Sequence, residues 1–104
     1  MSAPPTRAQA FARIAASEDA IRALGVARLA LFGSVLRDEA TADSDVDLLV
    51  QFAEGEKTYR RFLDLADLLE EVLGHRVDLV TTEALSRHIG PHIVAEAQDV
   101  LPAA

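Results

Sequence analysis

Acidic residues interrupt two of the most apolar runs in this chain of 104 residues. Asp45 and Asp47 stand at the start of one run, which continues as Leu48-Leu49-Val50, and Asp78 lies within Val77-Asp78-Leu79-Val80. The first run lacks apolar-polar alternation, which is typical of a strand buried on both faces. Charged side chains are rarely buried unless they are paired or bind a metal. The pattern therefore predicts buried strands that carry a site for divalent cations and a nucleotide.

The spacing of the first two acids indicates how they would act. Side chains alternate across a strand, so Asp45 and Asp47 should project from the same face, with roots about 6.5 to 7 Å apart. Magnesium prefers oxygen ligands, and pairs of ions about 3.5 to 4 Å apart support phosphoryl transfer. We therefore expect these two acids to bind metal, with Asp78 completing the shell of one ion, and expect repulsion to raise at least one carboxyl pKa. In the alternative interpretation, Asp45 caps the strand and Asp47 is a solvated edge residue.

A glycine-serine pair, Gly33-Ser34, follows the strand predicted for residues 28–32. Glycine permits close approach of the backbone to a ligand, and amides at the start of the next short helix are directed toward anions. Ser34 would add a hydroxyl donor, and Arg37 a planar guanidinium, toward a triphosphate. Because a Gly-Ser turn alone is an ordinary helix start, the predicted nucleotide site depends on its combination with the acid pair.

The remaining pattern predicts an α/β or α+β fold, with a small β-sheet flanked by helices. Apolar spacing and capping residues predict helices over residues 6–24, 35–39, 59–73 and 91–101, and apolar runs predict strands over residues 28–32, 46–52 and 76–81. No internal repeat is present. We expect one domain over residues 1–104, since this length suits a single core.

Composition excludes several classes of protein. The chain has no cysteine, so disulfides, thiolate zinc sites and a cysteine nucleophile are all excluded. A net charge of −7 opposes tight binding to long nucleic acid. The N-terminal residues lack the charged and apolar regions of a leader, and no apolar stretch approaches the roughly 20 residues that span a bilayer. These features predict a cytoplasmic protein with no membrane association.

The combined motifs resemble a known family. Gly33-Ser34-x-x-Arg37, followed by Ser44-Asp45-x-Asp47 and by Val77-Asp78-Leu79-Val80, is similar to the minimal nucleotidyltransferases (MNT) of the DNA polymerase β superfamily. More narrowly, the chain resembles the antitoxins of MNT/HEPN toxin-antitoxin pairs. The resemblance implies a polymerase-β-like core with a mixed sheet and covers most of the chain, including the helix start Ile89-Gly90-Pro91-His92-Ile93.

The resemblance also implies roles for individual residues. Gly33 and Ser34 would bind the triphosphate, with Arg37 and Ser44 in the same nucleotide site. Asp45 and Asp47 would hold two Mg²⁺ ions, and Asp78 would be the third ligand and would orient the attacking hydroxyl. Many members have glycine where this chain has Asp38, an acid that would weaken the phosphate field.

The activity implied by the resemblance is transfer of AMP from ATP, with release of pyrophosphate, to a tyrosine of a HEPN toxin. That toxin is an RNase, which the modification silences, and the two proteins are expected to form a complex. The alternative is a binding module that neutralises the toxin by contact alone. Transfer to a small molecule, as in aminoglycoside-modifying relatives, would require a second domain to hold the substrate.

Overall fold

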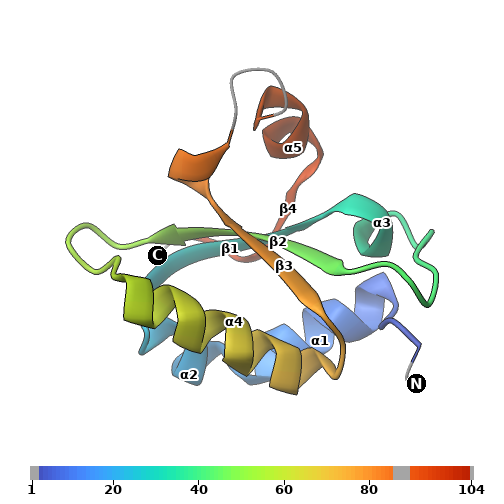
Figure 1. The fold of residues 1–104 in the computed structure, drawn as a ribbon, viewed down its shortest axis with the longest axis horizontal. Helices are drawn as coiled ribbons and strands as arrows, with labels where there is room; N and C mark the ends of the chain where they lie inside the picture. The colour runs from blue at the N-terminus through green and yellow to red at the C-terminus, as the bar shows by residue number, and fades with distance from the viewer. Residues whose placement is uncertain (1–2, 86–89, 104) are drawn as a thin grey trace.

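A computed structural model describes residues 3–85 and 90–103 of the chain. Its helices are α1 (Arg7–Ala16), α2 (Glu18–Arg22), α3 (Gly33–Leu36), α4 (Tyr59–Leu73) and α5 (Gly90–Glu96), with a 3-10 turn η1 (Thr82–Ala84). Its strands are β1 (Val26–Phe32), β2 (Val46–Phe52), β3 (Val77–Thr81) and β4 (Gln98–Leu101), which form one sheet in the order β3-β2-β1-β4 (Figure 1). No helix in these described ranges has the length and apolarity needed to cross a bilayer.

The sheet is mixed, as the family resemblance implies. Strand β1 pairs antiparallel with both β2 and β4, whereas β2 pairs parallel with β3. Strand β2 is therefore an inner strand, and Asp47 lies between Phe32 on β1 and Asp78 on β3. This position excludes the interpretation of Asp47 as an edge residue.

Helices cover both faces of the sheet. Helices α1, α2 and α4 lie on one face and α5 on the other (Figure 1). Leu48 belongs to the main core on the face of α1 and α4, whereas Leu49 packs in a smaller cluster on the face of α5. Both are buried, which confirms the predicted strand with two buried faces.

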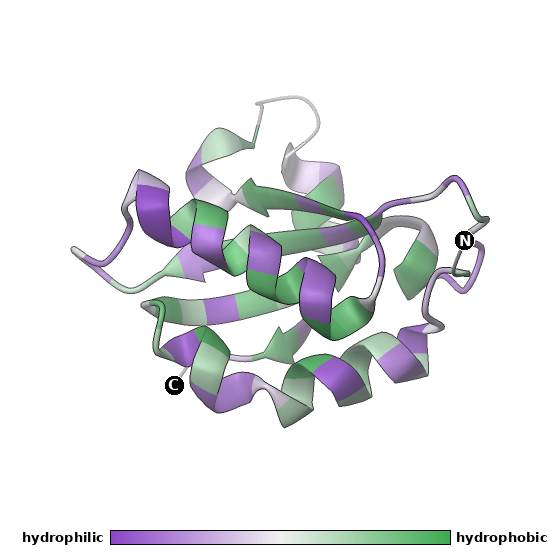
Figure 2. Cartoon of the chain, turned by 60° about the horizontal axis from the view of Figure 1, so that its bottom comes forward, coloured by the Kyte–Doolittle hydropathy of each residue, from purple (hydrophilic) through white to green (hydrophobic). Residues whose placement is uncertain are grey.

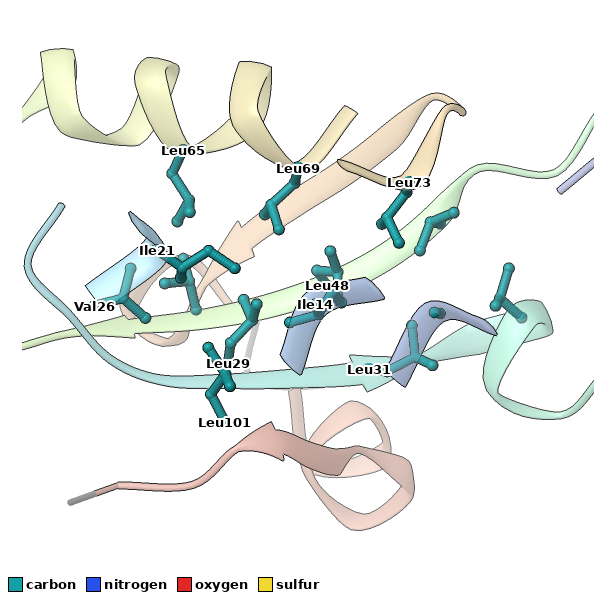
Figure 3. Packing of buried hydrophobic residues seen from close by; sticks show 14 of the residues in the cluster. Ile14, Ile21, Val26, Leu29, Leu31, Leu48, Leu65, Leu69, Leu73 and Leu101 are labelled. Atoms are coloured by element: carbon teal, nitrogen blue, oxygen red, sulfur yellow. The ribbon is translucent and has the colours of Figure 1, made fainter. Parts of the chain in front are cut away.

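Helix α4 has the predicted bounds because its sequence contains both end signals. The Thr58 side chain accepts a hydrogen bond from the backbone N–H of Arg61, and Gly74 ends the helix in the left-handed conformation with φ 65°. Leu65, Leu69 and Leu73 recur at helical spacing and point into the core (Figure 3). Hydrophilic residues occupy the outward side of this helix (Figure 2).

The N-terminal helix predicted over residues 6–24 is instead two helices. Thr6 caps α1 through a reciprocal capping box with Gln9. Ser17 leaves the helical conformation, with φ −108° and ψ 17°, and separates α1 from α2. Ile14 of α1 and Ile21 of α2 are both fully buried in the main core. Positions seven apart also share one face of a continuous helix, so apolar spacing alone does not reveal the break.

The last helix predicted, residues 91–101, is wrong in its second half. Helix α5 ends at Glu96, and residues 98–101 form β4 on the open edge of β1. Pairing with β1 buries Leu101 opposite Leu29 and supplies hydrogen-bond partners to an otherwise exposed strand edge. Ile89, which precedes α5 in the family pattern, lies outside the described residues.

Candidate active site

Three acids gather where β2 and β3 begin, on the sheet face that α5 covers. Asp47 and Asp78 are register partners on the parallel strands β2 and β3, and Asp45 directly precedes β2. Asp47 is half-buried, whereas Asp45 and Asp78 are exposed. The two strands thus bring the three predicted acids to one side of the sheet, with Asp47 innermost.

The electrostatics of Asp47 confirm the predicted repulsion. Burial, followed by repulsion from Asp78, Asp45 and Glu96, raises the pKa of Asp47 to about 6, against a smaller lowering effect of Arg37. Both burial and nearby like charges disfavour an ionised carboxyl group. At neutral pH, Asp47 therefore holds a negative charge that nearby cations of the chain only partly compensate.

Asp45 is paired with a cation of the chain. Arg76 Nε donates to Asp45 Oδ1 at 2.9 Å, and the same guanidinium donates to the backbone oxygen of Asp43 at 3.2 Å. Within residues 3–85 and 90–103, no three His, Cys, Asp or Glu side chains converge in a geometry that could hold a metal ion. A shared cation would therefore compete with Arg76 for Asp45 Oδ1.

The acids nevertheless fit magnesium chemically. Asp45, Asp47 and Asp78 offer only hard carboxylate oxygens, which Mg²⁺ prefers over nitrogen or sulfur ligands. Their mutual repulsion, focused on Asp47, is the kind of energy that a bound cation relieves.

Gly33 lies directly against this carboxylate cluster. Its φ is +77°, and a Cβ built on it would lie 2.1 Å from Asp47 Oδ2. Any larger residue would therefore meet both a strained backbone and the carboxylate of Asp47. The group that approaches Gly33 is thus a side chain of the site itself, and the predicted approach of a ligand to this glycine stays a prediction.

Arg37 and Gly33 share a partner that the sequence reasoning missed. Arg37 Nη1 donates to Glu96 Oε1, and the backbone N–H of Gly33 donates to Glu96 Oε2 at 3.4 Å. Arg37 also lies 3.6 Å from a carboxylate oxygen of Glu39. In the sequence, Glu96 is only one acid within the last predicted helix, and nothing there indicates its contact with Arg37 and Gly33. Ser34 follows Gly33 in the first turn of α3.

Ser44 and Asp38 have local structural roles. Ser44 Oγ accepts a hydrogen bond from the backbone N–H of Thr41 at 2.9 Å, and its carbonyl oxygen accepts one from His75 Nε2 at 2.6 Å. Asp38 has φ 55°, a conformation that glycine adopts readily, and its carboxylate accepts from the backbone N–H of Arg7 at 2.8 Å. The nucleotide role of Ser44 stays a prediction, and the Asp38 carboxylate is engaged at the start of α1.

Comparison with known proteins identifies the class. The sequence profile of the nucleotidyltransferase domain matches residues 14–103. The chain therefore belongs to the nucleotidyltransferase domain family, which confirms the resemblance and the predicted class of enzyme. The protein adenylyltransferase MntA of Thermococcus cleftensis is 43% identical over 72 residues, which are 69% of this chain and 72% of that protein.

Solved structures share the fold. A protein assigned as a minimal nucleotidyltransferase matches with a TM-score of 0.79 and 37% identity, over 90% of this chain and 95% of the other. A toxin-antitoxin complex with AMP-PNP matches with a TM-score of 0.70 and 22% identity, over 89% and 73% of the two chains. The Shewanella oneidensis complex of a tri-AMPylated HEPN toxin with an MNT antitoxin matches with a TM-score of 0.56 and 23% identity, over 86% and 72%. At these lower identities the likeness concerns the fold.

Proposed function

We propose that this nucleotidyltransferase transfers AMP from ATP to a tyrosine of a HEPN RNase toxin, with Mg²⁺, and thereby acts as its antitoxin. The observation that carries the proposal is the placement of Asp47 beside Asp78 in the parallel register, directly against the backbone of Gly33. Carboxylates for cations and a close-lying backbone for phosphates are the two requirements of nucleotidyl transfer. The family of the chain performs this class of reaction.

Each site residue has a role in this proposal. Asp45, Asp47 and Asp78 would hold two Mg²⁺ ions, which would neutralise the phosphate charge and stabilise the attacking and leaving oxygens. Gly33, Ser34, Arg37 and Ser44 would bind the triphosphate. The tyrosine hydroxyl oxygen attacks the α-phosphorus, the bond from that phosphorus to the α,β-bridging oxygen breaks, and pyrophosphate leaves. Asp78, exposed beside Asp47, would orient the hydroxyl and receive its proton.

The relatives support the choice of substrate and partner. MntA of Thermococcus cleftensis is named a protein adenylyltransferase. Two complexes with the same fold hold, respectively, an ATP analogue and a HEPN toxin that carries three AMP groups. We therefore propose a HEPN toxin as the protein substrate and a stable heteromeric complex as the working form.

Labelled ATP tests the reaction. Incubated with Mg²⁺ and the cognate toxin, ATP labelled at the α-phosphate should leave its label on the toxin, because the AMP group is transferred. ATP labelled at the γ-phosphate should leave none, because that phosphate departs in pyrophosphate. Label from the γ-phosphate alone on the toxin would make the enzyme a kinase and would reject the proposal.

A double variant separates catalysis from contact. Asp45→Asn combined with Asp47→Asn keeps the side-chain shapes and removes two charges, so the fold should persist by circular dichroism. We expect both label transfer and rescue of cells from the toxin to be lost. Rescue that persists without any modification of the toxin would support neutralisation by contact alone.

A further inference from the structure

Glu96 has no role in the proposed reaction, yet it contacts two of its groups. Helix α5 packs onto the sheet through Ile93, against a small cluster that includes Phe32 and Leu49. This packing sets the end of α5 beside Gly33, on the face opposite α1 and α4 (Figure 1). The Glu96 side chain is 31% exposed, so it is partly enclosed rather than free in solvent.

The two carboxylate oxygens of Glu96 bind separate donors. One accepts from the Arg37 guanidinium, and the other accepts from the backbone N–H of Gly33 at 3.4 Å. The proposed function assigns these same donors to the triphosphate. A carboxylate that bridges a backbone N–H and a guanidinium satisfies them as two phosphate oxygens would.

We propose that Glu96 is an autoinhibitory anion that occupies the phosphate position and that the nucleotide must displace. The inference rests on the proposed function, since it concerns the same nucleotide site. Arg37 has several N–H groups and can bind more than one anion, but the backbone of Gly33 has a single N–H. Glu96 and a phosphate oxygen therefore compete for that donor, and repulsion between the two anions adds to the competition.

A purely structural role explains the contact less well. The Arg37 side chain is 47% exposed, and ion pairs at such exposed positions contribute little to stability. Helix α5 is held instead by the apolar contacts of Ile93, and of Ala97 directly after the helix, with the sheet. Replacement of the Glu96 carboxylate should therefore leave the fold intact and release the two donors.

The expected change in nucleotide affinity depends on the fraction of molecules in which Glu96 has left the two donors. A ligand that binds only when Glu96 has left shows an affinity reduced by the fraction of molecules in that open state. A charge-assisted hydrogen bond at an exposed position shifts the equilibrium between the closed and open states by about three- to tenfold. Removal of the contact should tighten nucleotide binding by that factor.

Isothermal titration calorimetry with AMP-PNP and Mg²⁺ tests the inference on the full chain. We expect Glu96→Gln to lower Kd by about three- to tenfold, because the neutral amide competes poorly with phosphate. Glu96→Asp should also lower Kd, because its shorter side chain keeps the charge but loses the reach. The matched control is Glu39→Gln, which removes one charge near Arg37 without a contact to Gly33 and should leave Kd within about twofold.

Each other outcome overturns the proposal in a distinguishable way. An unchanged or weaker affinity in Glu96→Gln would reject autoinhibition, while binding by the wild type would leave the proposed function standing. An equal gain in Glu39→Gln would assign the effect to net charge and would also reject it. Absence of saturable binding in the wild type and in every variant would reject the nucleotide site itself, and with it both proposals.

Discussion

Asp47→Asn is expected to raise the melting temperature of the metal-free protein at neutral pH while lowering AMP transfer on the order of a thousandfold. The loss follows because Asp47 is the innermost acid of the proposed metal site, and metal stabilisation of a transition state is worth several kcal/mol. The melting temperature should rise because burial and three neighbouring acids raise the pKa of Asp47 to about 6. The ionised carboxylate therefore destabilises the folded state.

The pH dependence gives the sign of this effect. A carboxyl group whose folded pKa lies above its unfolded value of about 4 binds more protons in the folded state between these two pKa values. Its destabilisation is absent below pH 4, grows as the pH rises to about 6, and is complete above that pH. Because the side chain is half exposed, solvent screening reduces the cost to about 1 kcal/mol, or about 5 °C in Tm for a domain of this size.

Calorimetric melts in chelator from pH 4 to pH 8 measure the difference between wild type and Asp47→Asn. The two proteins should melt together at pH 4, and the variant should melt higher at pH 7. Added magnesium should reverse the order, since a ligand at a hundredfold excess over Kd stabilises the wild type by about 2.7 kcal/mol. A variant that melts lower than wild type in chelator at pH 7 would show that the ionised Asp47 stabilises the fold.

Local signals in the sequence predict part of this structure accurately. Helix α4 has Thr58 and Gly74 at its ends and a continuous apolar stripe, so its bounds are evident. Strand β2 has the predicted bounds as well, because Leu48-Leu49-Val50 requires burial on both faces. The side of the sheet on which the three acids lie also follows from the predicted strands, since side chains alternate between the two faces of a strand.

Features that depend on distant partners could not be predicted in this way. Residues 98–101 fit a helical spacing and a strand equally well, and the open edge of β1, some seventy residues earlier in the chain, selects the strand. The pairs of Arg76 with Asp45 and of Arg37 with Glu96 join residues 31 and 59 positions apart. Each arginine has several acids within possible reach, and only the packed fold determines which one it contacts.

Gly33→Ala should lower the rate of AMP transfer at least about a hundredfold and destabilise the fold beyond the cost of backbone strain. Gly55→Ala is a matched control, because Gly55 has the same φ of +77° and a Cβ there would meet no atom within 4 Å. The left-handed conformation costs a non-glycine residue about 1 to 2 kcal/mol, so both variants should lose about that much stability. Only Gly33→Ala also forces Asp47 away, because its Cβ would lie 2.1 Å from Asp47 Oδ2.

Denaturant unfolding and AMP-transfer rates of the two variants distinguish the effect of backbone strain from the effect of displacing the Asp47 side chain. Gly55→Ala should keep the wild-type rate, whereas Gly33→Ala should lose at least about a hundredfold, since small displacements of catalytic groups have effects of that size. Gly33→Ala should lose more stability than Gly55→Ala because of its clash with Asp47. The double variant Gly33→Ala with Asp47→Ala removes the clashing oxygens, so it should recover part of that additional loss. If Gly33→Ala matches Gly55→Ala in both stability and rate, the close approach between Gly33 and Asp47 does not support the site.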